Sequence, residues 1–212
     1  MILFLDTVSP EPKFFIINKN KLIQSIQILD KKSNKISDKI VSKFLKLQKK
    51  FELGNQIKKL FVCSGPGSYT ALRVGIAFMY GLSISKNLPL LNLSCFDLLK
   101  LGITKSLQKK TLYLVCSSND QYFASIFSEE KKRYILKKIE GELKYSDIES
   151  IRFKYSISNF ALSNNLSRIV DNKNHKIMNI VDIIKTNYEF IETLPLDKVI
   201  SPIYISKNNL LR

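Results

Sequence analysis

The first third of the chain alternates short apolar runs with a longer stretch of helical periodicity. Apolar runs at 2–5, 14–17 and 22–29, separated by polar turn residues, predict three strands in a meander. From 33 to 53 the apolar residues recur at the spacing of an amphipathic helix, and Gly54 follows as a typical end signal. The apolar stripe of this helix comprises Ile36, Ile40, Phe44, Leu47 and Phe51, and the row of Val41 and Leu45 is expected to widen it.

The stretch 60–85 is the segment around which the rest of the chain is predicted to be organised. A short apolar strand at 60–63 leads into a turn built from two glycines and a proline, and an apolar helix begins at Tyr69. Ser68 is expected to cap that helix with its hydroxyl. Small residues four positions apart predict grooves on the helix surface that a second helix can approach closely. These pairs are Ala71 with Gly75 and Ala77 with Gly81.

The rest of the chain predicts a second half that resembles the first in its order of elements. A strand at 88–93 and a helix at 94–101, with Asp97 in its first turn, precede the polar, lysine-rich stretch 102–110. We place a domain boundary near Thr104, between an N-terminal lobe of residues 1–104 and a C-terminal lobe of residues 105–212. In the second lobe we expect strands at 111–116, 122–127, 133–139 and 155–157, helices at 146–151 and 177–188, and an extended tail at 199–205. The pattern predicts a two-lobed α/β fold.

Composition is that of a globular protein with a strongly basic balance. The 212 residues contain 34 Lys and Arg against 18 Asp and Glu, a net charge of +16. This excess favours an acidic partner such as nucleic acid, and it is equally typical of a chain encoded by an A+T-rich genome. No apolar run approaches the roughly 18 residues needed to span a bilayer, and the N-terminus lacks the basic start of a signal peptide. We therefore expect a cytoplasmic protein.

Few residues of the chain carry catalytic chemistry. Its three cysteines form no C-x-x-C pair and are expected to be buried thiols, and its one histidine, His175, is expected in a solvated loop. The glycine turn lacks the lysine of a Walker A motif, but Gly65, Gly67 and Ser68 could cradle an anion at a helix N-terminus. Asp6 and Thr7, at the end of the first strand, are a further candidate for phosphate or metal. A tight strand-to-helix corner and an aspartate bonding its own turn explain the same residues without a ligand.

Three segments of the sequence resemble the bacterial TsaB (YeaZ) family. They are Leu3-Phe-Leu-Asp-Thr7, Ser64-Gly-Pro-Gly-Ser-Tyr-Thr-Ala-Leu-Arg-Val-Gly75 and Pro202-Ile-Tyr-Ile-Ser-Lys-Asn208. The resemblance implies the actin-like (ASKHA, ribonuclease H-like) two-lobed fold with mixed β-sheets flanked by helices. It also implies a non-catalytic paralogue of TsaD, the subunit that transfers threonylcarbamoyl to the adenosine next to the anticodon of tRNA. The TsaD-type H-x-x-x-H metal motif is absent from the first helix, where Ser37–Phe44 contains no histidine.

This resemblance implies a scaffold subunit without catalytic residues or a metal of its own, whose first two helices bind a TsaD-type subunit. We expect a TsaE-type ATPase to join that pair, ATP and metal to be held by the partner subunits, tRNA to be reached through the complex, and the isolated chain to form a homodimer. The predicted partner interface comprises Phe44, Leu47, Ala71, Gly75 and Phe78, and Gly75→Leu is expected to block pairing without unfolding the monomer. The alternatives are a kinase-like nucleotide-binding enzyme, a metallopeptidase-like protein of the same superfamily, or a direct RNA-binding module.

Overall fold

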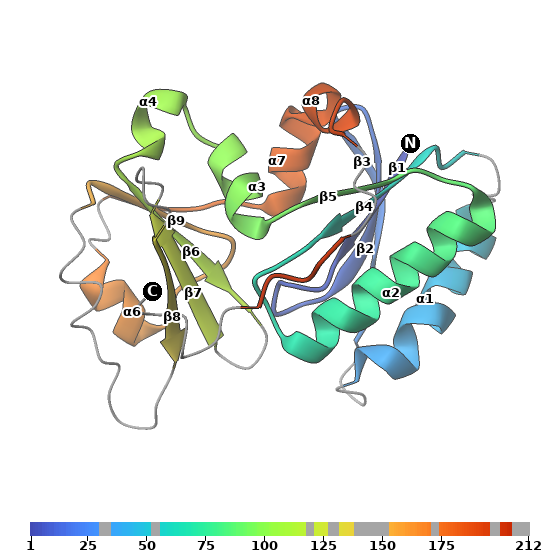
Figure 1. The fold of residues 1–212 in the computed structure, drawn as a ribbon, viewed down its shortest axis with the longest axis horizontal. Helices are drawn as coiled ribbons and strands as arrows, with labels where there is room; N and C mark the ends of the chain where they lie inside the picture. The colour runs from blue at the N-terminus through green and yellow to red at the C-terminus, as the bar shows by residue number, and fades with distance from the viewer. Residues whose placement is uncertain are drawn as a thin grey trace.

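Two mixed five-stranded sheets, each covered by helices, form two lobes side by side (Figure 1). The structure is a computed structural model that describes residues 1–29, 35–51, 56–117, 121–126, 132–137, 153–170, 174–195 and 200–204. Within these ranges the predicted two-lobed α/β architecture is confirmed. The predicted helix at 146–151 lies outside the described residues.

The sheet of the first lobe has the strand order β3-β2-β1-β4-β5. Its strands are β1 (Ile2–Asp6), β2 (Lys13–Asn18), β3 (Lys21–Gln27), β4 (Lys59–Cys63) and β5 (Leu90–Leu93). The first three strands form the predicted antiparallel meander, and β4 and β5 run parallel to β1. Every residue of the central strand β1 is buried, because elements pack on both faces of this sheet.

Helices α1 (Ile36–Phe51) and α2 (Tyr69–Lys86) lie next to each other on one face of the first sheet (Figure 1). The predicted stripe of α1 is confirmed for Ile36, Ile40, Phe44 and Leu47, which are buried in one cluster with side chains from β1 and β2. The second row is not part of it: Val41 and Leu45 are 52% and 55% exposed. Each residue turns the helix by about 100°, so this row faces away from the sheet.

The sheet of the second lobe has the order β10-β9-β6-β7-β8. Its strands are β6 (Thr111–Cys116), β7 (Gln121–Ile126), β8 (Lys132–Lys137), β9 (Tyr155–Ser158) and β10 (His175–Ile177). Helix α3 (Cys95–Leu101) has the predicted cap, since Ser94 Oγ accepts from the Asp97 amide at 3.0 Å. Several elements were not expected, among them β10, α4 (Lys105–Gln108) inside the predicted polar linker, and α6 (Asn164–Ile169).

The helix predicted at 177–188 is shorter than expected: a strand precedes it, and a separate short helix follows it. Ile177 belongs to β10, and α7 (Ile180–Thr186) begins where the Asn179 side chain accepts from the Val181 amide at 2.8 Å. Asn187 ends α7, with its side-chain amide donating to the Ile183 carbonyl at 2.9 Å, and α8 (Tyr188–Glu192) follows. The side chains of these two asparagines form hydrogen bonds at the helix ends. These local bonds interrupt the helix although the apolar periodicity of the segment is continuous.

The second half of the chain returns to cover the first lobe. Helix α7 packs against β2 and β3 as well as against α3, and its apolar residues share one core cluster with Phe4 and Phe61. At the C-terminal end Ile200 is buried in the α1–α2 core, and the Ile203 amide donates to the Ser64 carbonyl at 2.7 Å. The two faces of the first sheet are thus covered by helices from both sides of the predicted boundary near Thr104.

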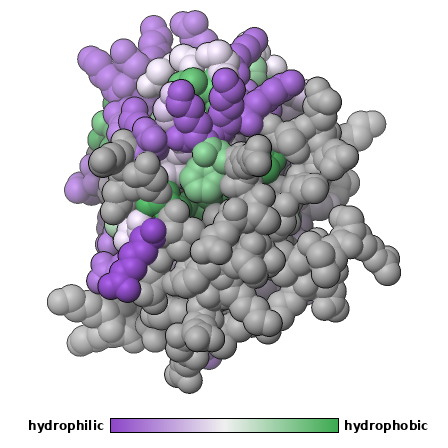
Figure 2. Space-filling view, turned by 90° about the vertical axis from the view of Figure 1, so that its left-hand side faces the viewer, coloured by the Kyte–Doolittle hydropathy of each residue, from purple (hydrophilic) through white to green (hydrophobic). Residues whose placement is uncertain are grey.

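The described surface is polar at the free end of the second lobe. Figure 2 shows this end, where hydrophilic residues cover the upper part and a small hydrophobic patch lies below them. The three cysteines, Cys63, Cys95 and Cys116, are buried thiols, as predicted. No helix in the part of the chain that the structure describes has the length and apolarity needed to cross a membrane.

Candidate functional site

The residues predicted to bind a partner lie in the core of the first lobe. Phe44, Leu47 and Ala71 are buried. Phe78 packs its ring against those of Phe14 and Phe44, at centroid distances of 5.7 and 5.4 Å. Phe78 itself is only partly buried. The predicted interface is therefore wrong for Phe44, Leu47 and Ala71, because these side chains are used between α1, α2 and the sheet and are not on the surface.

Gly75 is required by a close approach inside the monomer. A Cβ atom at this position would lie 2.7 Å from Cγ2 and 2.9 Å from Oγ1 of Thr7, which directly follows β1. The groove between Ala71 and Gly75 thus receives the end of β1 rather than a partner helix. For the same reason we now expect Gly75→Leu to destabilise the monomer, in contrast to the sequence-based expectation.

A different surface of α1 and α2 faces outward. We call it the outer helix face, and it comprises Val41, Leu45, Ala77, Gly81 and Ile84. Ile84 is 80% exposed, and a Cβ atom added at Gly81 would meet no atom within 4 Å. The sequence contained a signal for this face, because Ala77 and Gly81 are the second pair of small residues four apart. Sequence reasoning assigned the interface to the first pair, which is buried.

The glycine turn after β4 is packed on both sides by backbone. Gly65 has φ +106°, which favours glycine, and its carbonyl accepts from the Cys95 amide at 2.7 Å. A Cβ atom at Gly65 would lie 3.0 Å from the Ile203 carbonyl oxygen and 2.9 Å from Leu72 Cδ1. The turn therefore joins the start of α3 and the returning C-terminal segment to the first lobe.

Asp6 and Thr7 lie beside this turn, because β1 and β4 are neighbouring parallel strands. The Asp6 carboxylate accepts from the amides of Val8 and Ser9 at 2.9 and 3.1 Å, and burial raises the pKa of Asp6 above its usual range. The hydroxyl of Thr7 is buried and has no hydrogen-bond partner among the described residues. The Asp6 carboxyl thus accepts hydrogen bonds from its own turn, which is the explanation of this residue that requires no ligand.

A cleft of about 880 Å³ lies between the lobes, and both apolar side chains and hydroxyl groups line it. The polar lining residues are Lys35, Ser37, Ser68, Thr70, Ser117, Tyr122 and Ser163. Ser68 does not cap α2 with its side chain as predicted; its amide donates to Ser117 Oγ of the second lobe at 3.0 Å. Asp6 instead lines a separate hollow of about 390 Å³ with Ser9, Glu11 and Asn159. The residues predicted for phosphate, Asp6, Thr7, Gly65, Gly67 and Ser68, meet at one sheet edge but do not line one cavity.

His175 was expected in a solvated loop, but it lies on the edge strand β10 and is partly buried. Its Nε2 lies 3.2 Å from Ser158 Oγ, whose own hydrogen is donated to the Phe160 carbonyl at 2.5 Å, so Nε2–H donates to Ser158. Its Nδ1 lies 2.9 Å from Ser156 Oγ and accepts from that hydroxyl. Across the described residues, no three His, Cys, Asp or Glu side chains form a group that could hold a metal ion.

We expect the free energy of unfolding to fall as the pH drops below about 6.5 because of His175. Burial lowers its pKa from 6.5, so below that pH the unfolded chain binds a proton that the folded chain resists. This loss of stability begins near pH 6.5 and ends at the pKa that His175 has in the folded chain. NMR titration of this single histidine should give a pKa below 6.5, and His175→Gln should remove this part of the pH dependence. A folded pKa at or above 6.5 would contradict the buried, neutral ring.

Comparison with known proteins gives a family match and close similarity of fold. The family model described as "TsaD: tRNA N6-adenosine threonylcarbamoyltransferase" matches residues 30–134. The structure is similar to YeaZ from Pseudomonas aeruginosa, with a TM-score of 0.59, 11% identity and coverage of 96% of this chain and 99% of that chain. A second similar structure is that of an uncharacterized protein with similarity to peptidase YEAZ from Pseudomonas aeruginosa. Its TM-score is 0.60 at 11% identity, and the match covers 97% of this chain and 99% of that chain. The comparison with curated proteins found no match.

At 11% identity the structural matches establish the fold, which is the actin-like fold of YeaZ over nearly the whole chain. The match to the TsaD family model covers α1, α2 and the glycine turn. Together the two findings confirm the resemblance of this chain to the TsaB (YeaZ) family.

Proposed function

We propose that this chain is a non-catalytic scaffold subunit that binds a TsaD-type subunit. In this role it supports the transfer of threonylcarbamoyl to the adenosine next to the anticodon of tRNA. The TsaD-type domain at residues 30–134 and the YeaZ-like fold support a role in this tRNA modification system. The observation that carries the more specific proposal is the outer helix face.

The outer helix face has the features of a helix-docking surface. Val41, Leu45 and Ile84 are each more than half exposed, and burying such side chains contributes about 25 cal/mol per Å² of apolar area. Ala77 and Gly81 lie on the same side of α2 and are small, so a partner helix can approach the α2 backbone closely. Apolar groups collected on a charged surface are typical of protein interfaces.

On this proposal the TsaD-type subunit seats on the outer helix face, and a TsaE-type ATPase joins the pair. ATP and metal are held by the partner subunits. Without a partner, two copies of the chain bury the same face in a homodimer. A homodimer and the heterodimer therefore exclude each other.

Gly81→Leu is expected to abolish binding to a TsaD-type subunit while leaving the monomer folded. The new side chain enters open space at Gly81, so it blocks the close approach of a partner helix without touching the core. Size-exclusion chromatography of the mixed subunits should show co-elution for the wild type and separate peaks for Gly81→Leu. Ile84→Asp should act in the same way, because it places a charge in the apolar face.

Ile177→Asp is the matched control for Ile84→Asp. Ile177 is also more than half exposed, but it lies on β10, away from α1 and α2. Co-elution of Gly81→Leu and Ile84→Asp with the TsaD-type subunit at the wild-type ratio would show that the partner binds elsewhere.

A further inference from the structure

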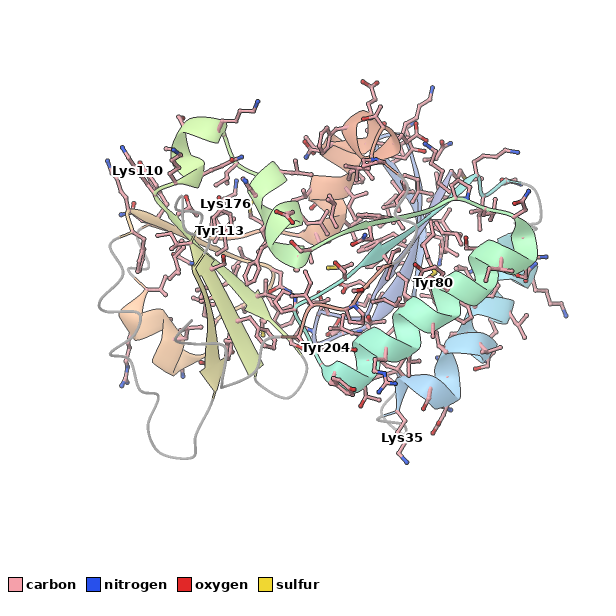
Figure 3. All side chains as sticks on the ribbon, viewed as in Figure 1. Lys35, Tyr80, Lys110, Tyr113, Lys176 and Tyr204 are labelled. Atoms are coloured by element: carbon pink, nitrogen blue, oxygen red, sulfur yellow. The ribbon has the colours of Figure 1, made fainter. Side chains whose placement is uncertain are left out.

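Two exposed tyrosines far apart in the sequence pack against each other, with tilted rings, at the start of α2. Tyr69 is the first residue of α2, and Tyr204 lies on the returning C-terminal segment. Their rings have a centroid distance of 4.6 Å and an interplanar angle of 39°, and they are 56% and 41% exposed. Figure 3 shows Tyr204 beside the N-terminal end of α2. Tertiary structure therefore builds a ring pair that remains open to solvent.

Arg73 completes this group, one helical turn after Tyr69. Its guanidinium carbon lies 5.1 Å from the centroid of the Tyr69 ring, and Nη1 donates to Tyr69 Oη at 2.9 Å. The hydrogen bond holds the arginine beside the rings, so little rotamer entropy remains to be lost on binding. We call Tyr69, Arg73 and Tyr204 the aromatic platform.

The charges around the aromatic platform favour an anionic ligand. Helix α2 contains no acidic residue, and α1 carries five lysines against one aspartate. Tyr69 lies between two residues of the interlobe cleft, Ser68 and Thr70, and Lys35 is on the same cleft wall. Since the chain as a whole carries a net charge of +16, an anion is also attracted at long range.

We propose that the aromatic platform is a stacking site for a base of single-stranded nucleic acid, whose phosphates lie toward Lys35 at the cleft mouth. Flat aromatic faces with a cation bind bases that are not stacked in a duplex, and basic groups beside them bind the backbone. A duplex keeps its bases stacked and offers only its phosphates. The site belongs to this chain alone, so it does not depend on the proposed TsaD-type partner.

The test uses an unstructured RNA of about 12 nucleotides with 2-aminopurine at its centre, a length within the range that one small domain covers. Stacking on the platform quenches 2-aminopurine fluorescence. Wild-type chain should quench the probe and bind this RNA more tightly than a duplex of equal length. Tyr69→Ala and Tyr204→Ala should weaken binding about tenfold and remove the quenching, whereas Tyr204→Phe should keep both.

Two matched controls separate stacking from charge. Phe190→Ala removes an equally exposed ring on α8 and should leave binding unchanged. Lys86→Gln removes the same charge as Arg73→Gln, at the other end of α2, and should weaken binding less than Arg73→Gln. Far-UV circular dichroism confirms that each variant is folded. Equal affinities for Tyr204→Ala and Phe190→Ala, or equal binding of duplex and single strand, would overturn the proposal.

Discussion

Phe44→Ala is expected to lower the free energy of unfolding by about 3–4 kcal/mol. The Phe44 ring is buried on the inner side of α1, at centroid distances of 6.0 Å from Phe14 and 5.4 Å from Phe78. Truncation leaves a cavity between helix and sheet and removes one tilted and one edge-to-face ring contact. Chemical denaturation followed by circular dichroism measures the loss as a lower midpoint with an unchanged slope.

Leu45→Ala is the matched control, since it truncates the next residue of the same helix, which points toward solvent. Leu45 is more than half exposed, so this change should alter the free energy of unfolding by less than about 0.5 kcal/mol. It should instead weaken pairing with a TsaD-type subunit. If Phe44→Ala weakens pairing and leaves stability at the wild-type value, Phe44 is an interface residue after all.

Gly75→Ala is expected to destabilise the chain, and Gly75→Leu to prevent it from folding stably. The added Cβ atom would lie 2.7 Å from Thr7 Cγ2, closer than packed atoms allow, and overpacking of this kind costs about 1–3 kcal/mol. Leucine adds three more carbons to the same space. Thermal unfolding should show a lower midpoint for Gly75→Ala and no cooperative transition for Gly75→Leu.

Thr7→Ala should rescue Gly75→Ala, because it removes both atoms that a Cβ atom at residue 75 would meet first. The lost hydroxyl has no partner among the described residues, so Thr7→Ala alone should cost little. A double-mutant cycle should therefore give a favourable coupling of about 1–2 kcal/mol. Gly81→Ala is the control, and it should be neutral or stabilising, since alanine favours a helix and space is open there. Additive effects of Thr7→Ala and Gly75→Ala would contradict the steric explanation.

The elements with strong local patterns were predictable. The meander at the N-terminus, the strand at 60–63 and the apolar stripe of α1 all follow from the spacing of apolar residues. The capping contact of Ser94 with Asp97 was also predictable, because both partners lie within one helical turn. Weaker signals led to wrong predictions at the end of the chain. Strand β10 was missed because it is only three residues long. The helix at 177–188 was predicted too long because side-chain hydrogen bonds of Asn179 and Asn187 set the helix ends.

The functional surfaces depended on contacts between distant parts of the chain. Both pairs of small residues on α2 have the same spacing, yet Gly75 receives Thr7 while Gly81 faces solvent. Tyr69 and Tyr204 are isolated tyrosines in the sequence, and they become a pair because the segment at 200–204 returns to the glycine turn. His175 lies in a polar stretch, and only pairing of β10 with β9 places it between two serines.

The amino-acid sequence by itself thus determined most of the helices and strands, the two-lobed order of these elements, and the resemblance to the TsaB (YeaZ) family. Those properties depend on the local periodicity of apolar side chains and on short motifs, which act within a few residues. Only the tertiary structure decided which side of α1 and α2 remains exposed and which side chains meet across the lobes. The physical reason is that a helix with apolar or small residues on two sides can bury either one, and the choice depends on the shape of the sheet beneath it.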